Sequence, residues 1–115
     1  MSAIKTPQKA IESEFVCYYN GDELNERSDE FRSQLPRMTW ASARRLRNAV
    51  GIEQVPDLIA MLESMKAEPY GPMMSVIINR TMIGWPDDPK DWAVFNELID
   101  QIIDFLRREP GPQPT

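Results

Sequence analysis

The stretch PKDWAVFNELIDQIIDFLRR, residues 89–108, decides the fold. Its large apolar residues follow the alternating three-and-four spacing of a packed helical seam, at positions 92, 95, 99, 102 and 106. Pro89 suits the first position of a helix, where a missing N–H loses no partner, and Arg107 and Arg108 suit the negative C-terminal end. We therefore expect a helix here, at the centre of the domain.

Apolar side chains cover more than half of the circumference of this expected helix. The helix could be buried on most sides in the middle of its own domain. Alternatively, part of it could form a homodimer interface. That interface would comprise Leu98, Ile102, Phe105 and Leu106.

The first helix is expected to open at Thr6-Pro7 and to end at Asn20-Gly21. Ile11, Phe15 and Tyr18 recur at spacings of four and three and so share one helical face. The density of β-branched and aromatic residues at 15–19 leaves a strand as the alternative.

Three more helices are expected before residue 68. Residues 22–35 carry a narrow apolar stripe, and Pro36 is expected to end that helix. A second helix should run from Met38 or Thr39 to Val50, before Gly51. A third opens at 55–57 and is broken by the prolines and glycine of 68–72.

Residues 73–83, MMSVIINRTMI, are the ambiguous segment. Their β-branched content favours a short β-hairpin, but the Asn79-Arg80 pair lacks the glycine of the favoured turns. A buried helix is the interpretation preferred here, because the neighbouring segments have helical patterns.

The pattern of the whole chain predicts a mostly α fold, a small single-domain bundle of five or six helices over residues 1–109. A disordered proline-rich tail is expected at 110–115.

The composition argues against most catalytic chemistry. The chain of 115 residues contains no histidine and a single cysteine, Cys17. Without histidine, Ser–His–Asp and Cys–His sites and histidine-ligated zinc are impossible. Cys17 lies in an apolar run, so we expect it to be buried and inert. We predict a protein that is not an enzyme, with no metal, no cofactor and no small-molecule substrate.

The N-terminus lacks the apolar core of a signal peptide, and no run approaches the ~18–20 apolar residues of a membrane span. We therefore expect an intracellular, cytoplasmic protein with no membrane partner. The formal net charge of −5 suits a basic protein partner better than it suits broad nucleic-acid binding.

One stretch opposes this acidity. Residues 36–52, PRMTWASARRLRNAVGI, lie in a gap without any acidic residue between Glu30 and Glu53. Arginine and tryptophan are enriched where interfaces bind most strongly. The candidate partner-binding residues are Arg37, Trp40, Arg44, Arg45 and Arg47.

Three interpretations of these residues are open. They could contact a protein, or they could contact the phosphates of nucleic acid, with residues 39–65 drawn as a helix-turn-helix. They could also pair with the chain's own acids, especially those of 22–30, with Trp40 in the core. The helix-turn-helix is less favoured, because the second helix exposes Asp57 and Glu63 and no arginine.

Five of the seven methionines lie within 22 residues, at positions 61, 65, 73, 74 and 82. They would suit an adaptable binding groove, although filling an irregular core is the preferred interpretation.

The functional prediction is a non-enzymatic protein-binding module: a small acidic adaptor, assembly factor or inhibitor. A phage-encoded protein directed at a host complex is one source that fits this size and composition. The alternatives are a helical DNA-binding regulator using residues 37–47 and a structural oligomer subunit assembled through residues 89–108.

Overall fold

The computed structural model describes residues 4–18, 29–81 and 89–108. These residues form five α-helices and one short 3-10 helix, and no strand occurs among them. The helices are α1 (Pro7–Tyr18), α3 (Asp29–Val50), α4 (Val55–Ala67), α5 (Pro72–Thr81) and α6 (Pro89–Arg107), with η1 (Ile52–Gln54) between α3 and α4. The prediction of a mostly helical protein is confirmed.

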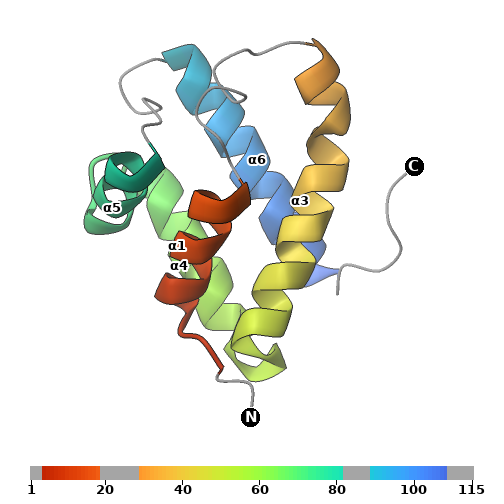
Figure 1. The fold of residues 1–115 in the computed structure, drawn as a ribbon, viewed down its shortest axis with the longest axis vertical. Helices are drawn as coiled ribbons and strands as arrows, with labels where there is room; N and C mark the ends of the chain where they lie inside the picture. The colour runs from red at the N-terminus through yellow and green to blue at the C-terminus, as the bar shows by residue number, and fades with distance from the viewer. Residues whose placement is uncertain (1–3, 19–28, 82–88, 109–115) are drawn as a thin grey trace.

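The helices pack as one compact bundle (Figure 1). The radius of gyration is 13.4 Å, which is about the value expected for a compact single domain of this length. The most extensive helix–helix contact joins α3 to α6, which crosses behind it in Figure 1. Helix α1 packs against α3, α4 and α5, and α4 also packs against α6.

Helix α6 supplies more of the core than any other helix in the described residues. Its apolar residues are fully or almost fully buried at Val94, Phe95, Leu98, Ile99, Ile102, Ile103 and Leu106. Phe95 stacks on Trp92, with ring centroids 4.9 Å apart, and its ring lies 6.1 Å from that of Phe15 on α1. The wide apolar surface of this segment is therefore the surface of a central helix.

The predicted helix end at Pro36 is wrong, because α3 continues through this residue as far as Val50. Pro36 lacks an N–H, so the carbonyl of Arg32 loses its helical partner. Tertiary packing keeps the helix continuous: Leu35 and Thr39, on either side of the proline, are both buried. The Thr39 hydroxyl donates to the Leu35 carbonyl at 2.9 Å and lies 3.0 Å from Oε1 of Gln101 on α6.

The other local signals predict the helices well. Helix α1 includes residues 15–18, so the strand alternative fails there. Helix α4 has its proline in the first turn, as expected. Residues 73–81 belong to α5, which confirms the helical interpretation for that part of the ambiguous segment. Residues 82 and 83, the predicted helix over 22–28 and the predicted tail at 110–115 lie outside the described residues.

A glycine makes the turn between α3 and η1. The φ angle of Gly51 is +80°, in the region that other residues rarely adopt. The N–H of Gly51 donates to the carbonyl of Arg47, and the backbone N–H of Lys5 donates to Ala49 nearby. The N-terminal segment is therefore attached to the end of α3.

Cys17 is exposed, so the prediction of a buried thiol is wrong. Its apolar neighbour Phe15 faces the core, but Cys17 lies two residues further along the helix and points away.

The methionines of the described residues mostly fill the core, in agreement with the preferred interpretation. Met65 and Met74 are buried, and Met61 and Met73 pack against the core while half-buried.

Candidate functional site

The outer face of α3 carries a line of charged and aromatic side chains. Arg37, Trp40, Arg44 and Arg47 follow one another at spacings of three, four and three residues. At 100° per residue, this spacing places them along one side of the helix. We call these four residues the α3 stripe. It extends over eleven residues, whose ten steps of 1.5 Å give a length of about 15 Å.

Arg44 and Trp40 form a contact with each other within the stripe. The guanidinium carbon of Arg44 lies over the Trp40 ring, 5.0 Å from its centroid. A cation over an indole face in this position is attracted by the ring's electrons, by about 0.5–1 kcal/mol at an exposed site. Trp40 is half-buried and Arg44 is exposed, so this contact holds the guanidinium against the surface and reduces the conformational freedom that binding would remove.

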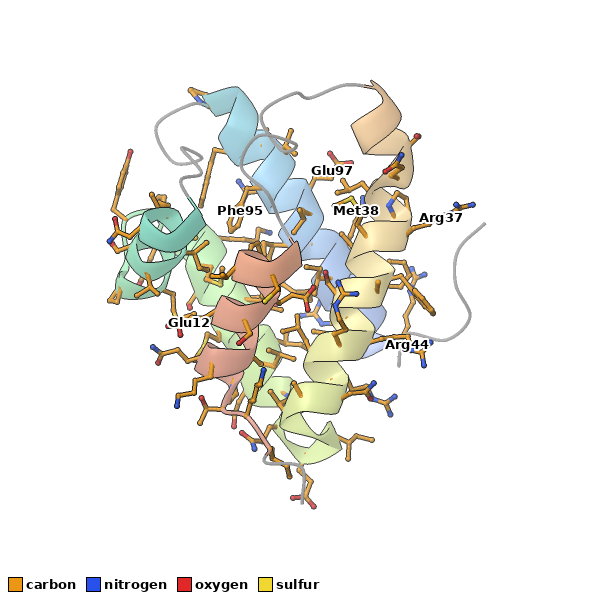
Figure 2. All side chains as sticks on the ribbon, in the orientation of Figure 1. Glu12, Arg37, Met38, Arg44, Phe95 and Glu97 are labelled. Atoms are coloured by element: carbon orange, nitrogen blue, oxygen red, sulfur yellow. The ribbon has the colours of Figure 1, made fainter. Side chains whose placement is uncertain are left out.

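The remaining arginines of the stripe have no acidic partner in the part of the chain that the structure describes. Arg37 is exposed and Arg47 is half-buried. Figure 2 shows Arg37 and Arg44 directed away from the body of the molecule, on the side of α3 opposite to α1. The stripe is therefore a local concentration of positive charge on a chain whose formal net charge is −5.

Arg45 does not belong to this surface. It points toward α1, where its Nη2 lies 2.6 Å from Oε2 of Glu14 and its Nε lies 3.0 Å from Oε1. The Ser42 hydroxyl donates to the same carboxylate at 2.8 Å. Glu14 is only 4% exposed, whereas the Arg45 side chain is 37% exposed. The prediction that Arg45 contacts a partner therefore has to be replaced by a role in joining α1 to α3.

The direction of Arg45 follows from helix geometry. Residue 45 lies about 100° away from residue 44 around the helix axis, so it faces a different neighbour. A signal for its partner was present in α1: Glu14 follows Ile11 by three residues and precedes Phe15, which places it at the edge of a buried face. The expectation that internal pairing would involve the acids of 22–30 missed Glu14, and residues 22–28 lie outside the described ranges.

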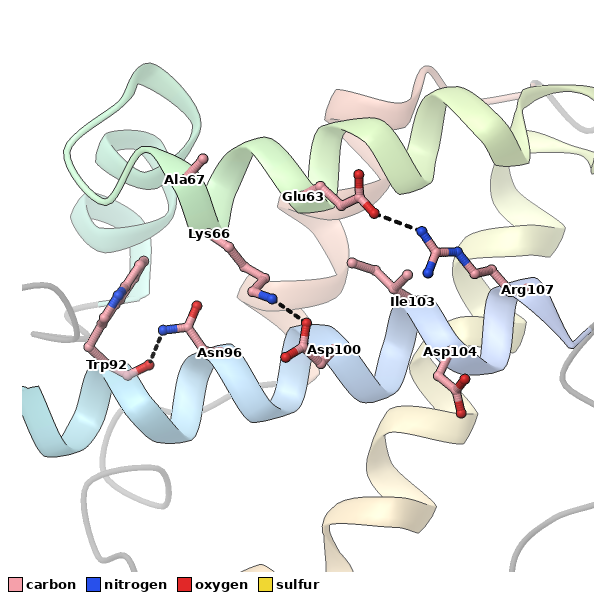
Figure 3. A pocket seen from close by; sticks show the side chains of 9 residues that line it. All are labelled: Glu63, Lys66, Ala67, Trp92, Asn96, Asp100, Ile103, Asp104 and Arg107. Atoms are coloured by element: carbon pink, nitrogen blue, oxygen red, sulfur yellow. Dashed lines mark hydrogen bonds and ion pairs between the residues drawn. The ribbon is translucent and has the colours of Figure 1, made fainter.

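A groove of about 680 Å³ lies between α4 and α6 (Figure 3). Its charged side chains are largely engaged with one another. Arg107 donates to Glu63 at 2.8 Å, and Lys66 is paired with Asp100. The Asn96 side chain donates to the backbone carbonyl of Trp92. These side chains already have partners within the groove, whereas Arg37 and Arg47 have no acidic partner in the described residues, so the α3 stripe is the stronger candidate for a contact surface.

The predicted oligomer interface on α6 lies mostly inside the molecule. Leu98, Ile102 and Leu106 are at most 3% exposed and belong to the chain's own core. Phe105 is half-buried and also packs against that core. The first of the two interpretations of this helix, burial in its own domain, accounts for these residues.

Two kinds of feature are absent from the described ranges: a metal-holding cluster and a membrane-spanning helix. Over residues 4–18, 29–81 and 89–108, no group of three histidine, cysteine, aspartate or glutamate side chains is arranged to hold a metal ion. None of the helices in those ranges combines the length and apolarity needed to cross a membrane. Comparisons with protein-family models, curated proteins and solved structures find no match to this chain.

Proposed function

We propose that this protein is a non-enzymatic binding module, of the adaptor, assembly-factor or inhibitor type, and that the α3 stripe contacts an acidic surface of a protein partner. The observation that carries the proposal is the contrast between arginines on the same helix. Arg45 is neutralised by Glu14 inside the fold, whereas Arg37 and Arg47 have no acidic partner in the described residues.

The negative net charge does not oppose an acidic partner at close range. At physiological ionic strength, charges more than about 8–10 Å apart are largely screened from each other. An approaching carboxylate would therefore respond mainly to the nearest side chains. Along the stripe these are three arginines and a tryptophan, with no acidic residue between positions 33 and 50 of α3.

A nucleic-acid partner is the weaker alternative. Phosphate recognition would need the second helix of the 39–65 unit to approach a groove, and this helix is α4. Asp57 and Glu63 are both exposed on α4 and would repel phosphates. An oligomer assembled through α6 is weaker still, since Leu98, Ile102 and Leu106 are already buried.

The test is affinity capture from a nuclease-treated lysate with three forms of the chain: wild type, R37E/R44E and K5E/K9E. The two double variants change the net charge equally, but Lys9 is an exposed residue of α1 and Lys5 is an exposed residue just before it, and neither belongs to the stripe. We expect a stoichiometric protein to be captured by wild type and K5E/K9E and to be lost with R37E/R44E or at high salt. Capture that survives R37E/R44E would contradict the proposal, and so would capture of nucleic acid alone when nuclease is omitted.

A further inference from the structure

A second groove, smaller than the one between α4 and α6 and more apolar, opens at the C-terminal end of α3. Its volume is about 470 Å³, within the range of about 300–1,000 Å³ typical of binding pockets. It lies between the end of α3, η1, the first turns of α4 and the end of α6. The residues lining it are Arg47, Ile52, Val55, Pro56, Ile59, Leu106 and Arg107.

One exposed isoleucine lines this groove, and a second lies close to the glycine that precedes it in the sequence. Ile52 is 61% exposed and Ile4 is 67% exposed. Ile4 lies against Gly51, because its Cδ1 is 4.0 Å from the position that a Cβ on this glycine would occupy. Scattered apolar residues on a surface are ordinary, but a contiguous apolar area rimmed by charged residues marks a docking site more often.

The groove and the α3 stripe form one continuous surface. Arg47 is the last residue of the stripe and also lines the groove. A second arginine, Arg107, lies at the groove and pairs with Glu63 at 2.8 Å. Both members of that pair are more than half exposed, so the pair contributes little and can be exchanged for another carboxylate at small cost.

We propose that this continuous surface binds a single amphipathic helix of the partner protein. Acidic residues of that helix would lie along Arg37, Arg44 and Arg47, and a bulky apolar side chain at one end would enter the groove. The three-four-three spacing of the stripe is that of a helix packed lengthwise against another helix, and the arginines at the groove complement acidic residues beside the apolar anchor. This inference rests on the proposed function and adds the form of the partner.

The probes are two synthetic helical peptides of about 18 residues, about 27 Å long. Each carries glutamates at three-four-three spacing, and a Leu-Phe anchor stands at the N-terminal end of one and at the C-terminal end of the other. Control peptides replace the anchor with alanines or the glutamates with lysines. Binding is measured by fluorescence anisotropy. The protein variants are Ile52→Ser, R37E/R44E and, as a control, Val16→Ser, which changes an exposed apolar residue on α1.

We expect one of the two acidic peptides to bind. Replacing its anchor with alanine, or Ile52 with serine, should weaken binding about tenfold, the scale of one interface anchor. Val16→Ser should leave binding unchanged. Because Ile52 is exposed, circular dichroism should show the Ile52→Ser variant to be folded like wild type.

Three results would overturn the inference. If binding depends on the arginines but not on Ile52 or on the anchor, the proposed function stands and the groove is not its anchor site. If no peptide binds at up to about 1 mM, the weak end of specific recognition, the surface does not take an acidic helix. If the chain itself forms dimers that Ile52→Ser dissolves, a second copy occupies the groove.

Discussion

Arg45 and Glu14 allow a sharp prediction, because their burial is unequal. Glu14 is 4% exposed and Arg45 is 37% exposed. In Arg45→Met, the carboxylate of Glu14 would remain buried with the Ser42 hydroxyl as its donor. In Glu14→Met, the guanidinium of Arg45 could instead turn toward water. Removing the arginine should therefore cost more stability than removing the glutamate.

The magnitude follows from the same contacts. Breaking a fully buried ion pair by removing one partner costs about 3–5 kcal/mol. The surviving bond from Ser42 and the partial exposure of Arg45 reduce the expected cost of Arg45→Met to about 2–4 kcal/mol. Because the Tm of a domain of this size falls by about 4 °C for each kcal/mol lost, the Tm of Arg45→Met should fall by about 8–16 °C. Glu14→Met should cost about 1 kcal/mol.

The assay is urea unfolding followed by circular dichroism. Arg44→Met is the matched control, because it makes the same substitution one residue earlier on the exposed face. It should cost no more than about 1 kcal/mol, the scale of the contact with Trp40. The double variant with methionine at 14 and 45 should be more stable than Arg45→Met alone, because no charge is left buried. If Arg45→Met costs no more than Glu14→Met or Arg44→Met, the argument from unequal burial is wrong.

Three further substitutions test the packing. Pro36→Ala restores an N–H to the interior of α3 but also frees the unfolded chain that proline restricts. The net effect should be a gain in stability of about 1–2 kcal/mol in urea unfolding. A loss of stability would show that the proline ring itself is needed. Phe95→Ala removes a fully buried ring and should cost about 3–5 kcal/mol; a cost below about 1 kcal/mol would contradict a core centred on α6. Gly51→Ala forces a side chain into a φ of +80° with a ψ of 156° and should lower stability by about 1–3 kcal/mol; a Tm equal to that of wild type would refute the strain argument.

Local sequence signals predicted the helices whose ends are set by local chemistry. Pro7, Pro56 and Pro89 all stand in the first turn of a helix, where proline loses no hydrogen bond. Gly51 stands just after a helix, where a positive φ is needed. The apolar spacing of residues 89–108 likewise predicted the central helix, because its buried residues repeat at the helical period.

Features decided by tertiary contacts were not predictable in the same way. Pro36 has the chemistry of a helix end, but the burial of Leu35 and Thr39 against the rest of the bundle keeps α3 intact. The partner of Arg45 is 31 residues away in the sequence, and no local pattern specifies that distance. For Cys17, the apolar composition of its neighbours was a poorer guide than the helical face on which it lies.

The candidate site was predictable as a region and not residue by residue. The absence of acids between Glu30 and Glu53 pointed to α3. Only the fold separates Arg45, which faces Glu14, from Arg44, which faces outward over Trp40. The groove beside Arg47 was not foreseen, because it is assembled from η1, α4 and α6.

The most direct test of the claim that the outer face of α3 contacts an acidic protein is site-specific photocrosslinking. A photoreactive residue would replace Asn48, which is exposed one turn beyond Arg44, and in a control it would replace Ser75, which is exposed on α5. The account predicts a protein crosslink from position 48 and none from position 75, with mass spectrometry locating it in an acidic segment of the partner. A crosslink to nucleic acid, or equal yields from the two positions, would contradict the account.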